Sequence, residues 1–386
     1  MIEENELLSR LDTRQRAESR VFRAPGRVNL IGEHTDYNDG FVMPVAIGFS
    51  TWVVVAPRAD RTLSVFSENF HEEVSFDLDD PPAQPRRHWS DYVRGVAWVL
   101  EQSGYQLRGA HLEIRGDLPI GTGLSSSASI EVATAYALLS HSGFEVQRVE
   151  LARLCQRAEN DFVGMRCGIM DQFVSCQGEK GKALLLDCRS LEYRLLPLPE
   201  SVRLVICNTM VKHELAAGEY NKRRAECEEG VRHLAQRLNG VSALRDVTLS
   251  QLESAGQDLP EVIYRRCRHV ISENARVVQA AAALERGDLD EFGRLMGESH
   301  RSLRDDYEVS CHELDLMVSF ANSLPGTFGA RMTGGGFGGC TVNLVSEEIV
   351  EEFKTQIANN YKEYTGMPPE IYVCRSADGA REIIFE

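Results

Sequence analysis

The stretch that decides the fold reads Leu118-Pro119-Ile120-Gly121-Thr122-Gly123-Leu124-Ser125-Ser126-Ser127-Ala128-Ser129, and an apolar run with helical spacing follows it. Its glycines allow tight turns, and its serines open a predicted helix over 125–139, whose first N–H groups have no partner within the helix. Those groups and the positive end of the helix dipole face one point, which predicts an anion site that suits a phosphate. The alternative is an ordinary capped helix after a glycine turn. The chain has no Gly-Lys-Ser/Thr of a P-loop.

Length and charge bound what the chain can be. At about 100–200 residues per domain, 386 residues predict two or three packed units. The 42 Lys and Arg residues against 58 Asp and Glu residues give a net charge of −16, which disfavours binding to nucleic acid. No apolar run approaches the roughly 20 residues of a membrane helix, and the acidic N-terminus differs from an export signal. We therefore expect a soluble cytoplasmic protein that binds neither membranes nor nucleic acid.

The cysteines agree with that expectation. None of the ten forms a Cys-x-x-Cys pair, which zinc knuckles and redox dithiols need. Scattered thiols of this kind are typical of reduced, mostly buried cysteines in the cytoplasm.

The pattern of apolar residues predicts an α+β fold in two lobes. A helical lead is expected at 1–19, and further helices at 89–102, 125–139, 148–161, 217–238, 261–286, 289–304, 311–323 and 347–362. Strands are expected at 22–31, 51–56, 63–66, 111–114, 172–176, 183–187, 202–208, 328–332, 340–345 and 370–374, with 63–66 as the partner of 51–56. The strand-rich first lobe is predicted to span 1–198, and the helix-rich second lobe 199–386.

A second glycine cluster lies between two predicted strands. It reads Thr333-Gly334-Gly335-Gly336-Phe337-Gly338-Gly339-Cys340. So many glycines are entropically costly in a simple turn, so the cluster favours close approach of the backbone to a ligand. A long flexible hairpin is the alternative.

A polar loop follows the first predicted strand, in Gly26-Arg27-Val28-Asn29-Leu30-Ile31-Gly32-Glu33-His34-Thr35-Asp36-Tyr37. Carboxylates and an imidazole at this density can bind several hydroxyls of one sugar. Two alternatives remain open: a metal site completed by ligands from elsewhere, and a polar turn without a ligand.

Asp171 is the fourth candidate, in Cys167-Gly168-Ile169-Met170-Asp171-Gln172-Phe173. An ionised carboxylate among apolar residues is costly without a partner, and a cation such as Arg27 would keep it charged. The alternative is a helix-capping Asp. Two glycine-rich anion loops and a hydroxyl-binding loop in one acidic protein indicate phosphoryl transfer to a polyol.

At these residues the chain resembles the GHMP sugar and metabolite kinases, and within them the galactokinases. Residues 26–38 resemble the galactokinase signature, 119–129 the phosphate loop of the superfamily, and 333–339 its C-terminal glycine motif. Residues 167–173 resemble the segment of the catalytic aspartate, and 300–310 also look galactokinase-like. The resemblance covers nearly the whole chain and implies a two-lobed GHMP kinase fold with the active site in the cleft between the lobes.

The resemblance also implies an activity and a set of roles. The activity is ATP-dependent phosphorylation of the anomeric hydroxyl of D-galactose to galactose 1-phosphate, the first committed step of galactose use. Asp171 is implied as the catalytic base, and Arg27 as the group that keeps it ionised and steadies the phosphoryl group. Mg²⁺, bound by Ser127 and Glu159, is implied as the cofactor of the ATP.

The remaining implied site residues bind the two substrates. Galactose is assigned to Glu33, His34, Asp36, Gly168 and Tyr220. ATP is assigned to Gly121, Gly123, Leu124, Ser125, Ser126, Ser127 and Ala128, with Trp89 and Tyr92 lining the adenine pocket. We expect a monomer whose partners are these small molecules.

Two other functions stay open from the sequence. A kinase of a related sugar, N-acetylgalactosamine or arabinose, would use the same motifs. A non-catalytic galactose and ATP sensor is also possible within the resemblance, although such sensors lose part of the phosphate loop, which is uninterrupted here.

Overall fold

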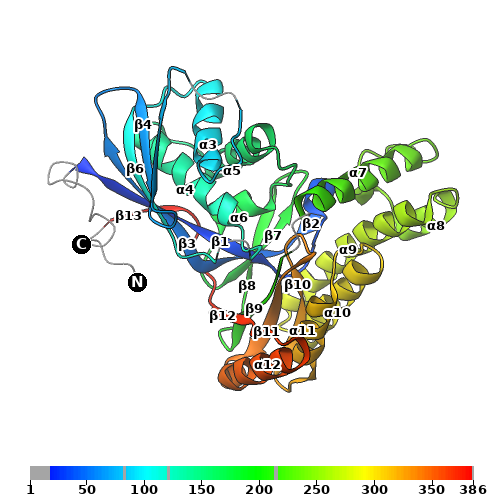
Figure 1. Cartoon of the computed structure of the whole chain (residues 1–386). Helices are drawn as coiled ribbons and strands as arrows, with labels where there is room; N and C mark the ends of the chain where they lie inside the picture. The colour runs from blue at the N-terminus through cyan, green and yellow to red at the C-terminus, as the bar shows by residue number, and fades with distance from the viewer. Residues whose placement is uncertain (1–17, 81–83, 120–121, 213–215, 385–386) are drawn as a thin grey trace.

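The computed structural model describes residues 18–80, 84–119, 122–212 and 216–384. The chain forms two layered bodies, each with a sheet and helices packed against it, and a pair of long helices extends from the second (Figure 1). The expected helical lead falls almost wholly on residues outside the described ranges.

The first body contains a sheet of six strands in the order β13-β1-β3-β6-β4-β5. Their bounds are β1 Arg20–Asn29, β3 Pro44–Pro57, β4 Thr62–Ser67, β5 Glu72–Asp77, β6 Ala110–Gly116 and β13 Arg381–Ile383. The expected pairing of 51–56 with 63–66 is wrong, because β6 lies between β3 and β4 and pairs with both. Alternation of apolar residues determines which face of a strand is buried, but it does not choose the neighbouring strand.

Within the described ranges, four helices cover this sheet: α3 (Ser90–Gln102), α4 (Ser126–His141), α5 (Arg148–Arg157) and α6 (Met170–Gln177), with a π-helical turn η2 (Ala158–Val163) after α5 (Figure 1). Their apolar sides share one core with the sheet. The strand expected at 172–176 is wrong, since these residues lie in α6. A short apolar run fits a buried strand and a buried helix equally well, and here Phe173, Val174 and Cys176 pack inward from a helix.

The second body contains four antiparallel strands in the order β10-β11-β9-β12. Their bounds are β9 Val202–Lys212, β10 Thr327–Thr333, β11 Gly338–Ser346 and β12 Glu370–Cys374. Side chains alternate along β9, so Leu204 and Ile206 join one apolar core while Val205 and Cys207 join another. The sheet is therefore buried on both faces.

Helices complete the second body. α11 (His312–Ser323) and α12 (Val350–Thr365) share the core of Val205, whereas α9 (Glu261–Glu285) and α10 (Leu289–Asp305) contribute to the core of Leu204. α7 (Ala216–Leu234) and α8 (Leu249–Ala255) pack on α9. Short 3-10 turns lie at η1 Asp36–Asn38, η3 Leu244–Asp246 and η4 Glu347–Ile349.

A small sheet of β2 (Phe41–Val42), β7 (Lys182–Asp187) and β8 (Tyr193–Pro197) lies where the two bodies meet. The last strand, β13, returns to the first body and pairs with β1. The division of the chain at 198 and 199 stays a prediction.

The ten cysteines all lie in the described ranges, and all are free thiols. Over the same ranges, no helix has both the length and the apolar character that crossing a bilayer requires.

Candidate active site

A cavity of about 480 Å³ lies at the meeting of the two bodies. Its walls come from the loop after β1, the start of α4, the segment before α6, α7 and the hairpin between β10 and β11. The predicted site residues that line it are Arg27, Glu33, His34, Asp36, Gly123, Ser125, Ser126, Ser127, Glu159, Gly168, Asp171 and Tyr220.

Arg27 and Asp171 form a two-pronged ion pair in this wall. Arg27 Nε lies 2.8 Å from Asp171 Oδ1, and Arg27 Nη2 lies 2.9 Å from Asp171 Oδ2. Ser125 Oγ donates to Asp171 Oδ2 at 2.5 Å. Burial alone would lower the pKa of Arg27, but the charges of Asp171, Glu33 and Asp36 outweigh burial and raise it. Asp171 lies in the first turn of α6 and does not cap that helix.

The start of α4 is open towards the cavity. Ser125 has a left-handed backbone with φ of 61° and makes no side-chain cap. Ser126 and Ser127 begin the helix and line the cavity. The alternative of an ordinary capped helix is therefore wrong. The N–H groups of the first turn of α4 are available to an anion.

The two glycine motifs meet here. Residues 334–337 join β10 to β11 as a hairpin, and a Cβ on Gly334 would lie 3.4 Å from the carbonyl oxygen of Gly123. The second glycine cluster is thus both a hairpin and part of the cavity wall.

Glu33 joins the polar loop to this hairpin. Its Oε1 accepts hydrogen bonds from Gly334 N at 2.8 Å and Thr333 Oγ1 at 3.1 Å. The same oxygen lies 3.3 Å from Nη2 of Arg331, which is fully buried. Glu33 therefore fixes the position of the loop as well as lining the cavity.

Asp36 and Gly168 are in tight contact. A Cβ on Gly168 would lie 2.0 Å from Asp36 Oδ2, so only glycine fits there. Burial, together with the charge of Asp171, raises the pKa of Asp36 to about 7. Near neutral pH, a hydrogen-bond partner can therefore shift Asp36 between its protonated and ionised forms.

His34 and Tyr220 lie on the same side of the cavity. Their ring centroids are 5.5 Å apart, and Tyr220 projects from α7. Burial, with the nearby charges of His269 and Arg223, lowers the pKa of His34 well below its usual value. His34 is therefore a neutral imidazole at physiological pH.

Glu159 lies at the other end of the cavity, beside Ser127. Burial and the charge of Asp171 raise the pKa of Glu159, while a hydrogen bond from Ser127 opposes that shift. Gln172 Nε2 donates to Glu159 Oε2 at 2.6 Å and to Glu131 Oε2 at 3.1 Å. In the described part of the chain, neither the Glu159 nor the Glu131 carboxylate pairs with a lysine or arginine. A bound cation would therefore stabilise the ionised form of these carboxylates.

This donor set fits Mg²⁺ bound together with phosphates. Among the described residues, no three His, Cys, Asp or Glu side chains form a metal cluster by themselves. Mg²⁺ typically takes one or two protein oxygens and completes its shell with water and substrate phosphates, and Ser127 and Glu159 offer such oxygens.

Some predicted residues do not reach the cavity wall. Leu124 and Ala128 are buried behind it, and Leu124 instead accepts a hydrogen bond from Arg27 N through its carbonyl oxygen at 3.1 Å. Trp89 stacks on Phe70, and its Nε1 donates to a carboxylate outside the cavity. Tyr92 does not line the cavity either, and burial, with the charge of Glu159, raises its pKa to about 12. Gly121 lies outside the described residues.

Several contributors were not predicted. Val211 and Met165 line the cavity, and Arg331 and Glu131 support it from behind. Val211 and Met165 are apolar residues without a motif, so the sequence carries no signal for them. Arg331 and Glu131 lie beside recognised motifs, and a charge inside an apolar strand or helix is the signal that could have revealed them.

Comparisons with known proteins agree with this geometry. The chain matches "GHMP kinases N terminal domain" over 91–179, "Galactokinase galactose-binding signature" over 12–57 and "GHMP kinases C terminal" over 280–363. It is 50% identical over 364 residues to a galactokinase of Roseiflexus sp. (strain RS-1), covering 94% of this chain and 93% of the relative. It is 51% identical over 361 residues to a galactokinase of Chloroflexus aggregans, with the same coverages of 94% and 93%.

Solved structures give the same result. A crystal structure of Lactococcus lactis galactokinase complexed with galactose superposes with a TM-score of 0.92 and 38% identity, covering 95% of each chain. Mevalonate kinase of Methanococcus jannaschii, with a TM-score of 0.64, 19% identity and coverages of 93% and 98%, shares the fold alone. The fold is thus the GHMP kinase fold, with N- and C-terminal domains, and the chain belongs to the galactokinase family.

Proposed function

We propose that the protein transfers the terminal phosphoryl group of ATP to the anomeric hydroxyl of D-galactose, giving galactose 1-phosphate and ADP. The observation that carries the proposal is the Arg27–Asp171 pair, which lies in one cavity between the polar loop at 33–36 and the two glycine loops. A polyol and a polyphosphate could meet at that pair. The galactose bound by the Lactococcus lactis relative gives independent support.

In this proposal Asp171 receives the anomeric hydroxyl. Its carboxylate is held by Arg27 and Ser125, so its orientation is set before the substrate arrives. Phosphoryl transfer passes through a loose transition state, so positioning and charge neutralisation contribute more than base strength. Asp171 would orient the hydroxyl and accept its proton, and the Arg27 guanidinium would lie where negative charge builds up.

We assign the other hydroxyls of the sugar to Glu33, His34, Asp36, Gly168 and Tyr220. Asp36 in its ionised form accepts hydrogen bonds, His34 is a neutral imidazole, and Gly168 supplies backbone where a side chain has no room. For the nucleotide, the N–H groups of Gly123 and of the start of α4 would offset phosphate charge locally. They would do so despite a net charge of −16 on the chain.

We assign Mg²⁺ to Ser127 and Glu159. The ion would neutralise phosphate charge and thus supply positive charge, which a chain with a net charge of −16 lacks. Trp89 and Tyr92 stay our proposal for the adenine side, and in the structure Trp89 is stacked on Phe70. We also propose that the protein works as a monomer in the cytoplasm, where ATP is available and free thiols stay reduced.

The test is a panel of sugars with Mg-ATP, read as ADP formation and as the ³¹P NMR spectrum of the product. We expect turnover with galactose and a product phosphorylated at the anomeric oxygen. A higher kcat/KM for N-acetylgalactosamine or arabinose would make the protein a kinase of that sugar. Binding of galactose and ATP without ADP formation would make it a sensor.

A further inference from the structure

A chain of hydrogen bonds leads away from His34 into the second body. His34 Nδ1 lies 2.8 Å from Tyr37 Oη, and Tyr37 Oη lies 2.7 Å from Tyr307 Oη. Tyr307 Oη in turn lies 3.2 Å from Cys227 Sγ on α7. Tyr307 is fully buried and does not line the cavity, so it can act on a ligand only through other residues. Its ring packs against His34, with the ring centroids 4.7 Å apart, and its hydroxyl reaches His34 through Tyr37.

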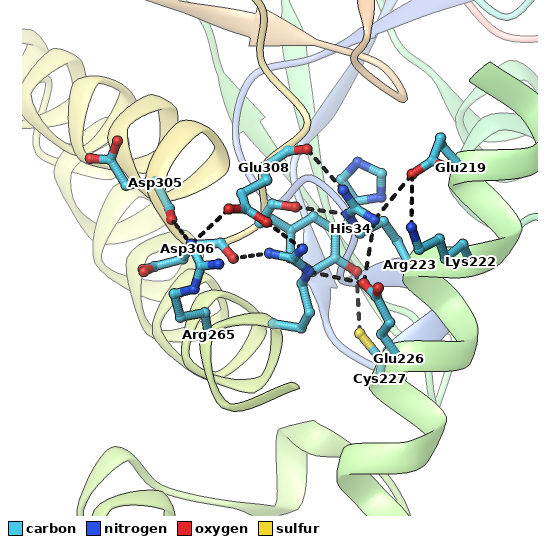
Figure 2. Close-up of polar contacts among 12 residues, drawn as sticks. His34, Glu219, Lys222, Arg223, Glu226, Cys227, Arg265, Asp305, Asp306 and Glu308 are labelled. Carbon is cyan, nitrogen blue, oxygen red and sulfur yellow. Dashed lines mark hydrogen bonds and ion pairs between the residues drawn. The ribbon is translucent and has the colours of Figure 1, made fainter. Parts of the chain in front are cut away.

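The backbone of Tyr307 is held as firmly as its hydroxyl. Arg223 Nε donates to the carbonyl oxygen of Tyr307 at 2.8 Å, and Arg223 Nη2 donates to that of Glu308 at 3.0 Å. Glu308 also pairs with Arg266 and Arg265. In Figure 2 the backbone carbonyl of Glu308 faces Arg223, and the Glu308 carboxylate points towards Arg265. The Tyr307 ring therefore has little freedom to turn away from Tyr37.

The chemistry of the chain favours one direction for its protons. A thiol is a weak hydrogen-bond acceptor, whereas an imidazole nitrogen is a good one. The favoured order therefore begins with the Cys227 thiol donating to Tyr307, continues with Tyr307 donating to Tyr37, and ends with Tyr37 donating to His34 Nδ1. Since His34 is neutral, its proton then lies on Nε2.

His34 Nε2 is the atom that remains available. It is buried and makes no hydrogen bond of ordinary geometry among the described residues, although the backbone of Gly335 lies near the ring and His34 lines the cavity. A buried N–H without a partner is costly, and a hydroxyl oxygen of a bound ligand would satisfy it.

We propose that Tyr307 is a positioning residue for sugar recognition: through Tyr37 it fixes the tautomer of His34 whose Nε2–H donates to one hydroxyl of the sugar. The inference rests on the proposed function, because it takes the ligand of the cavity to be galactose. It adds a residue outside the cavity wall to the determinants of sugar affinity, and it assigns His34 the role of donor.

The first test reads the tautomer without any substrate. In ¹⁵N-histidine-labelled protein, assigned with the His34→Gln variant, the imidazole ¹⁵N spectrum of His34 should show the Nε2–H form alone. Tyr307→Phe keeps the ring and removes the hydroxyl, and it should give a mixture of both tautomers. Tyr37→Phe should give the same mixture and serves if Tyr307→Phe fails to fold. An unchanged spectrum in a folded Tyr307→Phe variant, an unchanged spectrum in Tyr37→Phe, or an Nδ1–H form in the wild type overturns the proposal.

The second test uses galactose analogues that each lack one hydroxyl. For Tyr307→Phe we expect KM for galactose to rise about three- to tenfold, the range that one hydrogen bond supports, with KM for Mg-ATP and kcat nearly unchanged. With the analogue that lacks the hydroxyl bound by His34, wild type and variant should have the same KM. Equal penalties for the variant with every analogue overturn the assignment to His34.

A matched control removes a phenol hydroxyl elsewhere. Tyr361→Phe deletes a buried hydroxyl that donates to the carbonyl oxygen of Thr209 at 2.8 Å, and Tyr361 does not line the cavity. This variant should leave KM for galactose and the ¹⁵N spectrum of His34 as in the wild type. If KM for galactose rose as much in Tyr361→Phe as in Tyr307→Phe, the effect of Tyr307→Phe would come from a general loss of packing order and not from His34. Failure of the proposed function would appear separately, as wild-type protein that does not turn over galactose.

Discussion

Arg27 and Asp171 are 144 residues apart in the sequence and form an ion pair with two hydrogen bonds. Arg27 Nε donates to Asp171 Oδ1 at 2.8 Å, and Arg27 Nη2 donates to Asp171 Oδ2 at 2.9 Å. Arg27 comes from β1 and Asp171 from α6, so the pair exists only when strand and helix pack together. Arg27 Nη1 also donates to the carbonyl oxygen of Gly123 at 2.5 Å, which links the pair to the phosphate loop. The proposed base, Asp171, is thus held by the same Arg27 side chain that contacts the proposed nucleotide site.

Removing the charge of Asp171 should stop turnover and spare nucleotide binding. Asp171→Asn keeps the shape but can neither accept the proton nor pair with Arg27, so we expect kcat to fall about 10²- to 10⁴-fold. Calorimetric titration with Mg-ADP should give an affinity close to that of the wild type. Asp378→Asn, which weakens an exposed 2.9 Å pair with Arg381, is the control and should keep full activity. Full activity of Asp171→Asn would remove Asp171 from the mechanism.

Arg27 should not tolerate replacement by lysine. Arg27→Lys keeps one positive charge but cannot reach both oxygens of Asp171 and the Gly123 carbonyl together. We expect kcat to fall at least about 10²-fold for Arg27→Ala, with Arg27→Lys recovering only a minor part. Steady-state kinetics with galactose and Mg-ATP measures this, and near-normal turnover of Arg27→Lys would mean that a point charge is sufficient.

Asp36 should set an acidic limb in the pH profile. Its pKa is raised to about 7, so it becomes a hydrogen-bond acceptor for a sugar hydroxyl only as the pH rises through that value. We expect kcat/KM for galactose to fall below pH 7 with this pKa, and the limb to disappear in Asp36→Asn. His34 does not compete, because its pKa is shifted well below the usual range. A limb that persists in Asp36→Asn would assign it to another group.

The same shift has a consequence for stability. A carboxyl with a raised pKa in the folded state binds its proton more tightly there than in the unfolded chain. Ionisation of Asp36 therefore destabilises the fold as the pH rises from 3.8 towards 7. Urea unfolding should find Asp36→Asn more stable than the wild type at pH 8, with little gain near pH 4.

A methyl group at position 168 should impair sugar binding. The Cβ of Gly168→Ala would lie 2.0 Å from Asp36 Oδ2 and would displace that carboxylate. We expect KM for galactose to rise at least about tenfold, the loss of one charge-assisted hydrogen bond. Gly297→Ala is the matched control, since a Cβ there meets nothing within 4 Å in α10. Equal KM values for the two variants would contradict the tight contact.

Glu33 should matter for stability as well as for binding. Glu33→Ala leaves Arg331, which is fully buried, without its carboxylate partner. An uncompensated buried charge costs about 3–5 kcal/mol in the free energy of unfolding. Glu351→Ala breaks an exposed 3.0 Å pair with Lys354 and should cost less than about 1 kcal/mol. Urea unfolding compares the two, and equal losses would mean that Arg331 is paired in another way.

The local parts of the fold could be predicted from the sequence. The sequence predicts a helix after the serine-rich stretch from its long apolar run, and the structure places this helix at Ser126–His141. The run 172–176 could not be assigned, because five residues are fewer than the roughly 11–18 over which the periodicity of apolar residues distinguishes a helix from a strand. The position of β6 between β3 and β4 depends on long-range packing, and the short elements β5, β8, α8 and β13 carry too little pattern.

In the candidate site, too, residues in local motifs could be predicted, whereas contacts between distant segments could not. Motif residues such as Arg27, Glu33 and Asp171 could be predicted, because their chemistry is unusual for a loop or an apolar segment. That Arg27 contacts Asp171 was an interpretation that the structure confirms. Tyr307 could not be found this way, since its role depends on a contact across 270 positions with Tyr37. A buried tyrosine in the sequence has no visible partner until the chain is folded.

One measurement tests the central claim most directly: the distances around the anomeric oxygen in crystals soaked with galactose and a non-hydrolysable ATP analogue. The account predicts that this oxygen lies about 2.6–3.2 Å from a carboxylate oxygen of Asp171 and about 3–3.5 Å from the terminal phosphorus. A sugar whose anomeric oxygen faces away from Asp171, or a nucleotide bound outside the glycine loops, would contradict it.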